Sequence, residues 1–237
     1  MRKTLGCIRK ADEKYNMIDK DDIICVAVSG GKDSMLLLKA LSIYRRFSRN
    51  PFSIHALSVD VGFENTDFAA LEDFCREIDV PLTIVKTDIS RIVFDIRKET
   101  NPCSLCSKMK RAALNEAALE LGSNKICYGH HSDDFIESFL MSLLYEGRIH
   151  TFSPVTYLDR TGVYSLRPMI YAKEKDIIHA VREENIPVIK SGCPVDGYTK
   201  REDMKNLVKE LRGRVDNADD RIFTALLGYI DEAKKEY

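Results

Sequence analysis

Residues 29–34 combine two glycines with hydroxyl, ammonium and carboxylate side chains, and they read Ser29-Gly30-Gly31-Lys32-Asp33-Ser34. The apolar run 25–28 precedes this string, and the apolar, helix-favouring run 35–38 follows it. Paired glycines let the backbone turn with its N–H groups facing one point, and the N-terminus of the next helix directs unpaired amides and its positive dipole end there. The segment therefore predicts a phosphate cradle that suits pyrophosphate. A plain glycine turn between strand and helix is the alternative.

The string differs from two common nucleotide-binding motifs. A Walker motif needs four residues between its glycine and Gly-Lys, and a dinucleotide fold needs spaced glycines. The string resembles instead the PP-loop of ATP pyrophosphatases, which cleave ATP to AMP and pyrophosphate while adenylating a substrate. On this resemblance, residues 29–34 bind the phosphates of ATP, and Asp33 also belongs to the catalytic residues.

Cysteines form a second candidate centre. Cys103 and Cys106 open a predicted helix as C-x-x-C, and Cys193 follows Gly192 far downstream. At ~100° per residue, Cys103, Cys106 and Lys110 share one helix face. A C-x-x-C pair suits zinc, a dithiol redox pair or an iron–sulfur cluster alike. With Cys193, three thiolates around a 4Fe-4S cluster would leave one iron open to exogenous sulfide or a substrate atom, whereas zinc usually needs a fourth ligand.

Polar residues also follow two predicted strands. Asp60 ends the second, where the crevice of a parallel sheet would hold adenosine, so it is a candidate ribose or metal contact; a loop cap is the alternative. The fourth is followed by residues 129–134, which read Gly-His-His-Ser-Asp-Asp. Two carboxylates and two imidazoles exceed what helix capping needs. Gly129 and His130 are therefore candidates for nucleotide binding and Asp134 for metal or proton handling, while His131 is equally compatible with the surface.

The elements that must position these residues alternate along the chain. We expect strands over 23–28, 54–59, 82–85 and 125–128. Between and after them we expect helices over 4–18, 34–46, 66–79, 104–121, 132–146, 173–185, 199–213 and 217–235. This alternation predicts an α/β fold with a doubly wound parallel sheet.

The region beyond residue 150 departs from that alternation. Residues 151–155 and 163–167 flank a turn at 159–162 and predict a hairpin. Arg167 ends this hairpin and is a candidate phosphate contact, with an exposed arginine as the alternative. We expect a nucleotide-binding and catalytic domain over 1–190 and a helical C-terminal appendage, carrying the third cysteine of the centre, over 191–237.

Composition sets the surroundings of these sites. The chain has 237 residues, 44% hydrophobic and 31% charged, which suits one well-filled core with an appendage. It lacks the ~20-residue apolar segment of a membrane span and the apolar stretch of a secretion signal, so we expect a cytoplasmic protein without membrane contact. Seven cysteines, an odd number, then indicate metal or redox chemistry rather than disulfides.

The net charge of −1 gives no global attraction to nucleic acid, so RNA contacts must come from local basic faces. The candidate clusters are Arg2, Lys3, Arg9 and Lys10; Lys108, Lys110 and Arg111; and Lys200, Arg201, Lys205, Lys209 and Arg212. Solvated helix faces are the alternative interpretation, because acids are interleaved with these residues.

Together the motifs resemble the tRNA 2-thiocytidine synthetase branch of the PP-loop thiolation enzymes, almost end to end. The residues that carry the resemblance are 15–18, 29–34, 102–106, 129–134, 167–168 and 192–194. It implies an adenine nucleotide alpha hydrolase-like fold and ATP- and Mg²⁺-dependent replacement of a pyrimidine 2-oxo group in tRNA by sulfur, with cytidine as the favoured base. It also implies a 4Fe-4S cluster on Cys103, Cys106 and Cys193. Related thiouridine synthetases use a lysine and an aspartate at positions matching Lys110 and Asp134.

The chain departs from this family at one point. A second C-x-x-C pair is common downstream, whereas Asp196 stands at the partner position here. Asp196 could approach the open iron or cap a helix beginning near Thr199. The flanking zinc-finger cysteine pairs of some thiouridine enzymes are absent, which favours the shorter thiocytidine-like architecture.

We expect a reaction in two steps. The 2-oxo oxygen first attacks the α-phosphate of ATP, with Lys110 and Asp134 stabilising charge and moving a proton or positioning metal. Sulfur at the open iron then attacks C2 and expels AMP; in the rival route, a persulfide on Cys103 or Cys106 delivers it. The expected partners are tRNA, ATP and a sulfur donor such as sulfide or a cysteine desulfurase product, and a homodimer is left open. The alternatives are a PP-loop enzyme that adenylates or thiolates a small molecule and a nonenzymatic iron–sulfur sensor.

Overall fold

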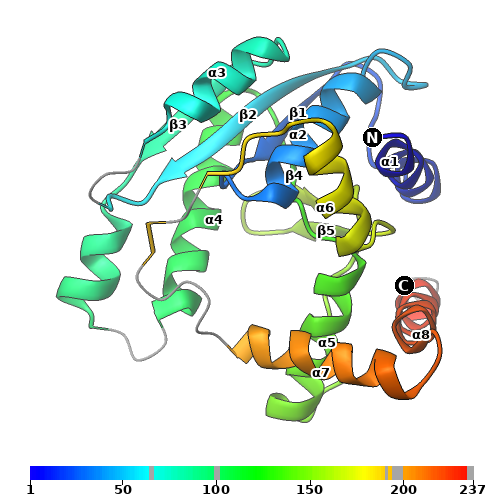
Figure 1. The fold of residues 1–237 in the computed structure, drawn as a ribbon. Coiled ribbons are helices and arrows are strands. Elements are labelled where there is room, and N and C mark those ends of the chain that lie inside the picture. Colours follow the sequence, from blue (N-terminus) through cyan, green and yellow to red (C-terminus); the bar gives the residue numbers. More distant parts are fainter. Residues whose placement is uncertain (64–66, 99–101, 190–191, 194–199, 234–237) are drawn as a thin grey trace.

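The computed structural model describes residues 1–63, 67–98, 102–189, 192–193 and 200–233. A six-stranded sheet in the order β3-β2-β1-β4-β6-β5 forms its centre (Figure 1). The strands are β1 (Asp22–Ala27), β2 (Phe52–Asp60), β3 (Leu82–Lys86), β4 (Lys125–Cys127), β5 (Val155–Leu158) and β6 (Val163–Leu166). All neighbouring pairs are parallel except β5 and β6. The expected doubly wound sheet is confirmed.

Helices cover both faces of this sheet. They are α1 (Arg2–Tyr15), α2 (Lys32–Tyr44), α3 (Ala69–Glu77), α4 (Pro102–Glu120), α5 (Ser132–Glu146), α6 (Glu174–Glu183), α7 (Lys200–Arg214) and α8 (Ala218–Ala233). The buried side chains of α1, α2, α3 and α6 form one core with one face, and those of α4 form a second core with the other. The chain winds outward from β1 to β3 and then returns to β4. The loops after β1 and β4 therefore meet at the switch point, where α/β sheets bind ligands.

Two local features differ from the sequence expectations. A π-helical turn, Arg91–Ile96, was not expected, because its one buried side chain, Val93, packs with Val61 and Ile89 and gives no helical period. In the hairpin, the first strand begins at Val155 rather than at residue 151, since the Thr151 hydroxyl donates to the Phe135 carbonyl (2.9 Å) and keeps residues 151–153 on α5.

The C-terminal helices pack on the rest of the chain. Met204 and Val208 of α7 share a small core with Ile136 and Leu140 of α5. Leu226 and Leu227 of α8 belong to the main core. The division of the chain into a domain over 1–190 and an appendage over 191–237 stays a proposal. No helix within the described ranges combines the length and apolar character that crossing a bilayer requires.

Candidate functional site

The loop between β1 and α2 is held in the shape that a phosphate cradle requires. Gly30 has φ +83°, and a Cβ there would lie 2.8 Å from Cβ of Ile189, so only glycine fits. The Ser29 amide donates to the Ser34 hydroxyl (3.1 Å), which donates to the Gly31 carbonyl (3.0 Å). Gly31 is the extended N-cap residue of α2 and has no side chain to cover the first amides of that helix. These amides are left for an anionic ligand.

Gly129 presses the end of β4 onto this loop. A Cβ at Gly129 would lie 2.9 Å from the carbonyl carbon of Asp33 and 2.9 Å from the amide nitrogen of Ser34. Both atoms are backbone and cannot rotate away. The segment after β4 is therefore fixed directly against the cradle, which brings the two polar motifs together at the switch point.

His131 lies at the centre of the acidic residues and is only 3% exposed, so the surface interpretation of this residue is wrong. Its Nε2 atom is 3.6 Å from Oδ1 of Asp33 and 3.3 Å from Oδ2 of Asp134, and its Nδ1 atom is 3.6 Å from Oδ2 of Asp133. Burial lowers the pKa of His131, but the surrounding carboxylates outweigh burial and raise that pKa above its usual value. His131 is thus a buried counter-ion that links the cradle to the N-terminus of α5.

The two aspartates after His131 have different environments. Oδ2 of Asp134 accepts a hydrogen bond from the His131 amide (3.0 Å), and its Oδ1 atom lies 3.8 Å from Arg201 Nη2. Asp133 accepts hydrogen bonds from the Glu174 amide (2.8 Å) and Arg212 Nη2 (2.5 Å). Burial would raise the pKa of Asp133, but the His131 side chain and then these two donors hold it well below the usual range. Asp133 is therefore a structural anion that fixes α6 and α7, whereas the Oδ1 atom of Asp134 has only a longer contact, with Arg201, among the contacts described.

Glu137 is a further buried acid that the sequence analysis missed. Its side chain is 8% exposed, and Arg201 Nε lies 3.5 Å from its Oε2 atom. Burial and the neighbouring Asp134 raise the pKa of Glu137 to about 7. The signal was present in the sequence, because Asp134 and Glu137 are three residues apart and share a helix face.

The cradle lysine is held by two carboxylates. Lys32 Nζ is 2.9 Å from Oδ2 of Asp33 and 3.1 Å from Oε1 of Glu174. The other oxygen of Asp33, Oδ1, is buried without a hydrogen-bond partner among the described residues. A buried carboxylate oxygen without a donor suits a hard cation such as Mg²⁺. The residues present therefore fit a magnesium-bound nucleotide.

The three cysteines of the second candidate centre lie in one electrostatic neighbourhood. Cys103 is exposed, while Cys106 and Cys193 are half-buried. Burial raises the pKa of the Cys106 thiol; the Lys110 ammonium opposes this, and Cys193 and Cys103 add to it. Close to Cys193, a Cβ at Gly192 would lie 3.5 Å from Cβ of Phe63. The first turn of α4 and the segment 192–193 therefore face each other beside the loop after β2.

The donor chemistry of this neighbourhood fits an iron–sulfur cluster. Three thiols, one ammonium group and an apolar wall formed by Phe63, Phe94, Leu105 and Met109 suit a cluster with thiolate ligands. Within the described ranges, no three Cys, His, Asp or Glu side chains already converge as metal ligands. The interpretation of Asp196 and of a helix start at Thr199 lies outside the described residues.

Arg167 is committed to the hairpin that it ends. Its Nη1 atom donates to the Ser153 carbonyl (2.7 Å) and the Thr156 hydroxyl (3.1 Å), and its guanidinium carbon lies 5.0 Å from the ring centre of Phe152. Its Nε atom is buried without a hydrogen-bond partner in the described structure. Burial lowers the pKa of Arg167 to about 10. A phosphate contact by Arg167 stays a prediction, and the observed contacts are with its own hairpin and the preceding loop.

Asp60 ends β2 and His130 follows β4, the two strands that flank β1 in the sheet. The His130 ring lies between Tyr128 (5.8 Å) and Phe152 (5.0 Å), and burial lowers its pKa to about 4, which keeps the imidazole neutral. Oδ1 of Asp60 accepts the Gly62 amide (2.9 Å), the arrangement of a loop cap. Nucleotide contacts by both residues stay predictions.

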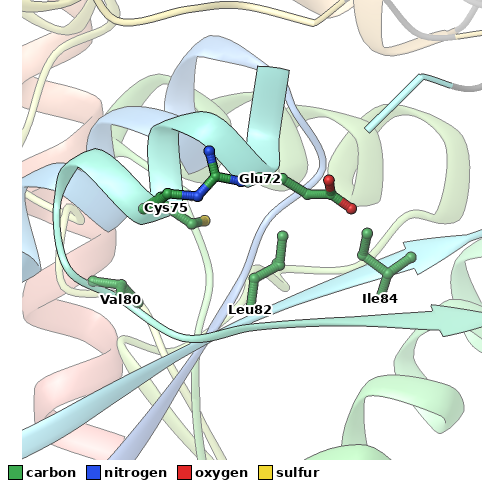
Figure 2. A pocket seen from close by; sticks show the side chains of 6 residues that line it. Glu72, Cys75, Val80, Leu82 and Ile84 are labelled. Atoms are coloured by element: carbon green, nitrogen blue, oxygen red, sulfur yellow. The ribbon is translucent and has the colours of Figure 1, made fainter. Parts of the chain in front are cut away.

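A separate hollow of about 440 Å³ lies between α3 and β3. Figure 2 shows that Glu72 and Cys75 of α3 and Leu82 and Ile84 of β3 line it. Leu82 begins β3, so the hollow opens at the amino end of an edge strand, whereas the cradle follows the carboxyl end of β1. It is not part of the site.

The glycine cradle after β1, packed at the switch point against the acids after β4, defines a PP-loop ATP-binding domain. Residues 4–207 match the PP-loop domain family. The tRNA-cytidine(32) 2-sulfurtransferase of Syntrophotalea carbinolica is 35% identical over 213 residues, which cover 89% of this chain and 82% of the relative. The enzyme of the same name from Legionella pneumophila is 35% identical over 212 residues, which cover 89% of this chain and 75% of that relative. The chain belongs to the tRNA-cytidine(32) 2-sulfurtransferase family, whose substrates are ATP, used with Mg²⁺, and tRNA, and the resemblance inferred from the motifs is confirmed.

Solved structures agree on the fold. The U34-tRNA thiolase NcsA from Methanococcus maripaludis, determined with its 4Fe-4S cluster, aligns with a TM-score of 0.79 at 20% identity, over 97% of this chain and 78% of that chain. The NH3-dependent NAD synthetase from Campylobacter jejuni aligns with a TM-score of 0.51 at 16% identity, over 96% of this chain and 93% of that chain. These likenesses establish the α/β architecture.

Proposed function

We propose that this protein replaces the 2-oxo group of cytidine 32 in tRNA by sulfur, with ATP as the activating substrate. One observation carries the proposal. The Ile189 amide donates to the Gly30 carbonyl of the cradle (2.9 Å), and Cys193, four residues further on, is close enough to Cys106 to shift its pKa. These two contacts support a sulfur-handling centre beside the phosphate cradle, as the two chemical steps require.

The first step activates the base. Residues 29–34 and the N-terminus of α2 bind the phosphates, and the Oδ1 atoms of Asp33, which is without a hydrogen-bond partner in the described structure, and of Asp134, which lies 3.8 Å from Arg201 Nη2, hold Mg²⁺ or accept a proton. The 2-oxo oxygen then bonds to the α-phosphorus, and pyrophosphate leaves. Gly129, His130, Asp60 and Arg167 complete the nucleotide site in this proposal.

The second step supplies sulfur. Cys103, Cys106 and Cys193 would hold a 4Fe-4S cluster, which supplies an iron without a protein ligand for exogenous sulfur. Lys110 favours the thiolate of Cys106 and thus prepares it as a ligand. Sulfur bonds to C2 of the activated base, and AMP leaves with the former 2-oxo oxygen. In the persulfide route, the outer sulfur of a persulfide on Cys103 or Cys106 bonds to C2 and AMP leaves. The thiol of the other cysteine then breaks the S–S bond, and an external thiol reduces the resulting disulfide, so this route needs no iron.

The remaining assignments concern the surroundings of the reaction. We infer a cytoplasmic protein that receives sulfur as sulfide or from a cysteine desulfurase product, and a homodimer is compatible with it. Lys108 and Arg111, exposed on α4 beside the cysteines, form the basic face we assign to tRNA.

The test measures 2-thiocytidine by nucleoside mass spectrometry in tRNA from cells that lack the gene and carry Cys106→Ser, Cys193→Ser or Cys7→Ser protein. We expect 2-thiocytidine with the wild type and with Cys7→Ser, which alters a cysteine of α1, and none with the other two. Iron and acid-labile sulfide after anaerobic purification separate the routes, because iron-free active protein contradicts the cluster. An unchanged nucleoside profile without the gene would refute the function, and AMP formation with a small metabolite but not with tRNA would replace it.

A further inference from the structure

Helix α7 carries a basic stripe, defined as Arg201, Lys205 and Arg212. At ~100° per residue these three positions fall within about 40° of one another, on the same helix as the buried anchors Met204 and Val208. The stripe reaches acids of the site rather than solvent alone. The ion pairs are Arg201 with Asp134 and Glu137, Lys205 with Glu174, and Arg212 with Asp133 and Asp219.

The contact of Lys205 is the most informative of these. Its Nζ atom is 2.9 Å from Oε1 of Glu174, and Nζ of Lys32 is 3.1 Å from the same oxygen. Lys32 belongs to the phosphate cradle. Two ammonium groups that converge on one anionic oxygen, one of them from the cradle, form the contact that a phosphate oxygen would receive.

The charges around Glu174 support this interpretation. Burial by itself would raise the pKa of Glu174, but Lys205 and Lys32 together hold it below the usual value, so it is an anion at neutral pH. The side chain of Glu174 is 18% exposed and that of Lys205 is 45% exposed, which places Lys205 at the rim, where an incoming ligand can reach it. Glu202 is a weaker acidic neighbour of Lys205 on α7.

We propose that Lys205 is an additional polyphosphate-binding residue of the ATP site. When no nucleotide is bound, the Glu174 carboxylate occupies the position of a phosphate group. When ATP binds, a β- or γ-phosphate oxygen takes the place of Glu174 Oε1 between Lys32 and Lys205. The inference rests on the ATP site of the proposed function and not on its RNA target. It also assigns α7, the helix that follows the Cys193-bearing segment in the chain, a direct role at the nucleotide.

Opposite effects of two substitutions test the proposal. Lys205→Met removes one ammonium–phosphate contact and should weaken binding of MgATP and of magnesium pyrophosphate about tenfold or more, while AMP binding changes less than about twofold. Glu174→Gln removes the competing anion and should tighten MgATP binding severalfold. Isothermal titration calorimetry on the full-length protein measures all three ligands. Lys205→Arg should retain most of the affinity, and Lys209→Met, on the exposed side of the same helix one turn away, is the matched control.

Two results would overturn the proposal. If Lys205→Met and Glu174→Gln shift MgATP affinity in the same direction, Lys205 acts only by holding Glu174 in place. If Lys205→Met weakens AMP as much as ATP, the residue does not contact the outer phosphates. Neither result affects the wild-type 2-thiocytidine measurement, so failure of this inference is distinguishable from failure of the proposed function.

Discussion

Gly129 gives the sharpest test of how the two motifs of the site are joined. In Gly129→Ala the new Cβ would lie 2.9 Å from the Asp33 carbonyl carbon and 2.9 Å from the Ser34 amide nitrogen, and 3.1 Å from the Asp33 carbonyl oxygen. Because all three atoms are backbone, the cradle itself must shift by some tenths of an ångström. Overpacking of this kind costs about 1–3 kcal/mol of folding free energy. The displaced atoms belong to the first turn of α2, so the amides that bind phosphate move as well.

We therefore expect Gly129→Ala to lower the free energy of unfolding by about 1–3 kcal/mol and kcat/KM for ATP about tenfold to hundredfold, because small misplacements of binding groups have effects of that size. Urea unfolding and AMP release during tRNA thiolation measure the two quantities. The control is Gly228→Ala in α8, where a Cβ has no atom within 4 Å and helix propensity predicts a gain of about 0.5–1 kcal/mol. An unfolding midpoint and kcat/KM that stay at wild-type values in Gly129→Ala would show that the two loops are not in contact.

Three further predictions follow from other contacts of the site. Since the pKa of Glu137 is raised to about 7, the folded protein retains a proton that the unfolded chain loses, so stability falls between about pH 4.5 and 7. In Glu137→Gln, the urea unfolding midpoint should fall less between pH 4.5 and 8 than it does in the wild type. Equal falls in the two proteins would contradict the raised pKa of Glu137. Arg167→Met should lower the free energy of unfolding in urea by about 1–3 kcal/mol, because the hydrogen bonds to the Ser153 carbonyl and the Thr156 hydroxyl are lost. If these loop contacts are the main role of Arg167, ATP should stabilise the variant and the wild type equally. Lys108→Ala with Arg111→Ala should weaken tRNA binding and reduce the slope of log Kd against log salt by roughly 1–2, and an unchanged slope would place the RNA elsewhere.

The sequence predicted those parts of the fold that depend on local patterns. The cradle at 29–34, the strands that alternate with helices and the hairpin all follow from glycine placement, apolar runs and turn residues. The errors lie at boundaries, where a distant contact decides. Helix α1 ends at Tyr15 because Asn16 takes φ 47° and the Ile18 amide donates to Asp12 Oδ1 (3.0 Å). The other carboxylate oxygen of Asp12 accepts a hydrogen bond from the Tyr44 hydroxyl of α2.

The site was predicted where its members are close in sequence and missed where they are not. Asp133 and Arg212 are 79 residues apart, and Glu174 and Lys205 are 31 apart, so no spacing rule relates them. His131 is ambiguous in the sequence because a histidine near a helix start is common on surfaces. Its role appears only when the fold brings the Asp33 carboxylate from another loop to its ring.

The charges of the site also explain why the C-terminal helices must stay docked. Asp133 and Glu137 both have side chains only 8% exposed, and their closest arginines, Arg212 and Arg201, come from α7. Removing the arginine partner of a buried carboxylate costs about 3–5 kcal/mol, a large part of the stability of a protein of this size. His131 alone cannot replace both arginines, because it already faces three carboxylates. Helix α7 is therefore energetically part of the PP-loop domain. A domain boundary at residues 190 and 191 would separate Arg201 and Arg212 from the buried carboxylates of α5 with which they form ion pairs at the ATP site.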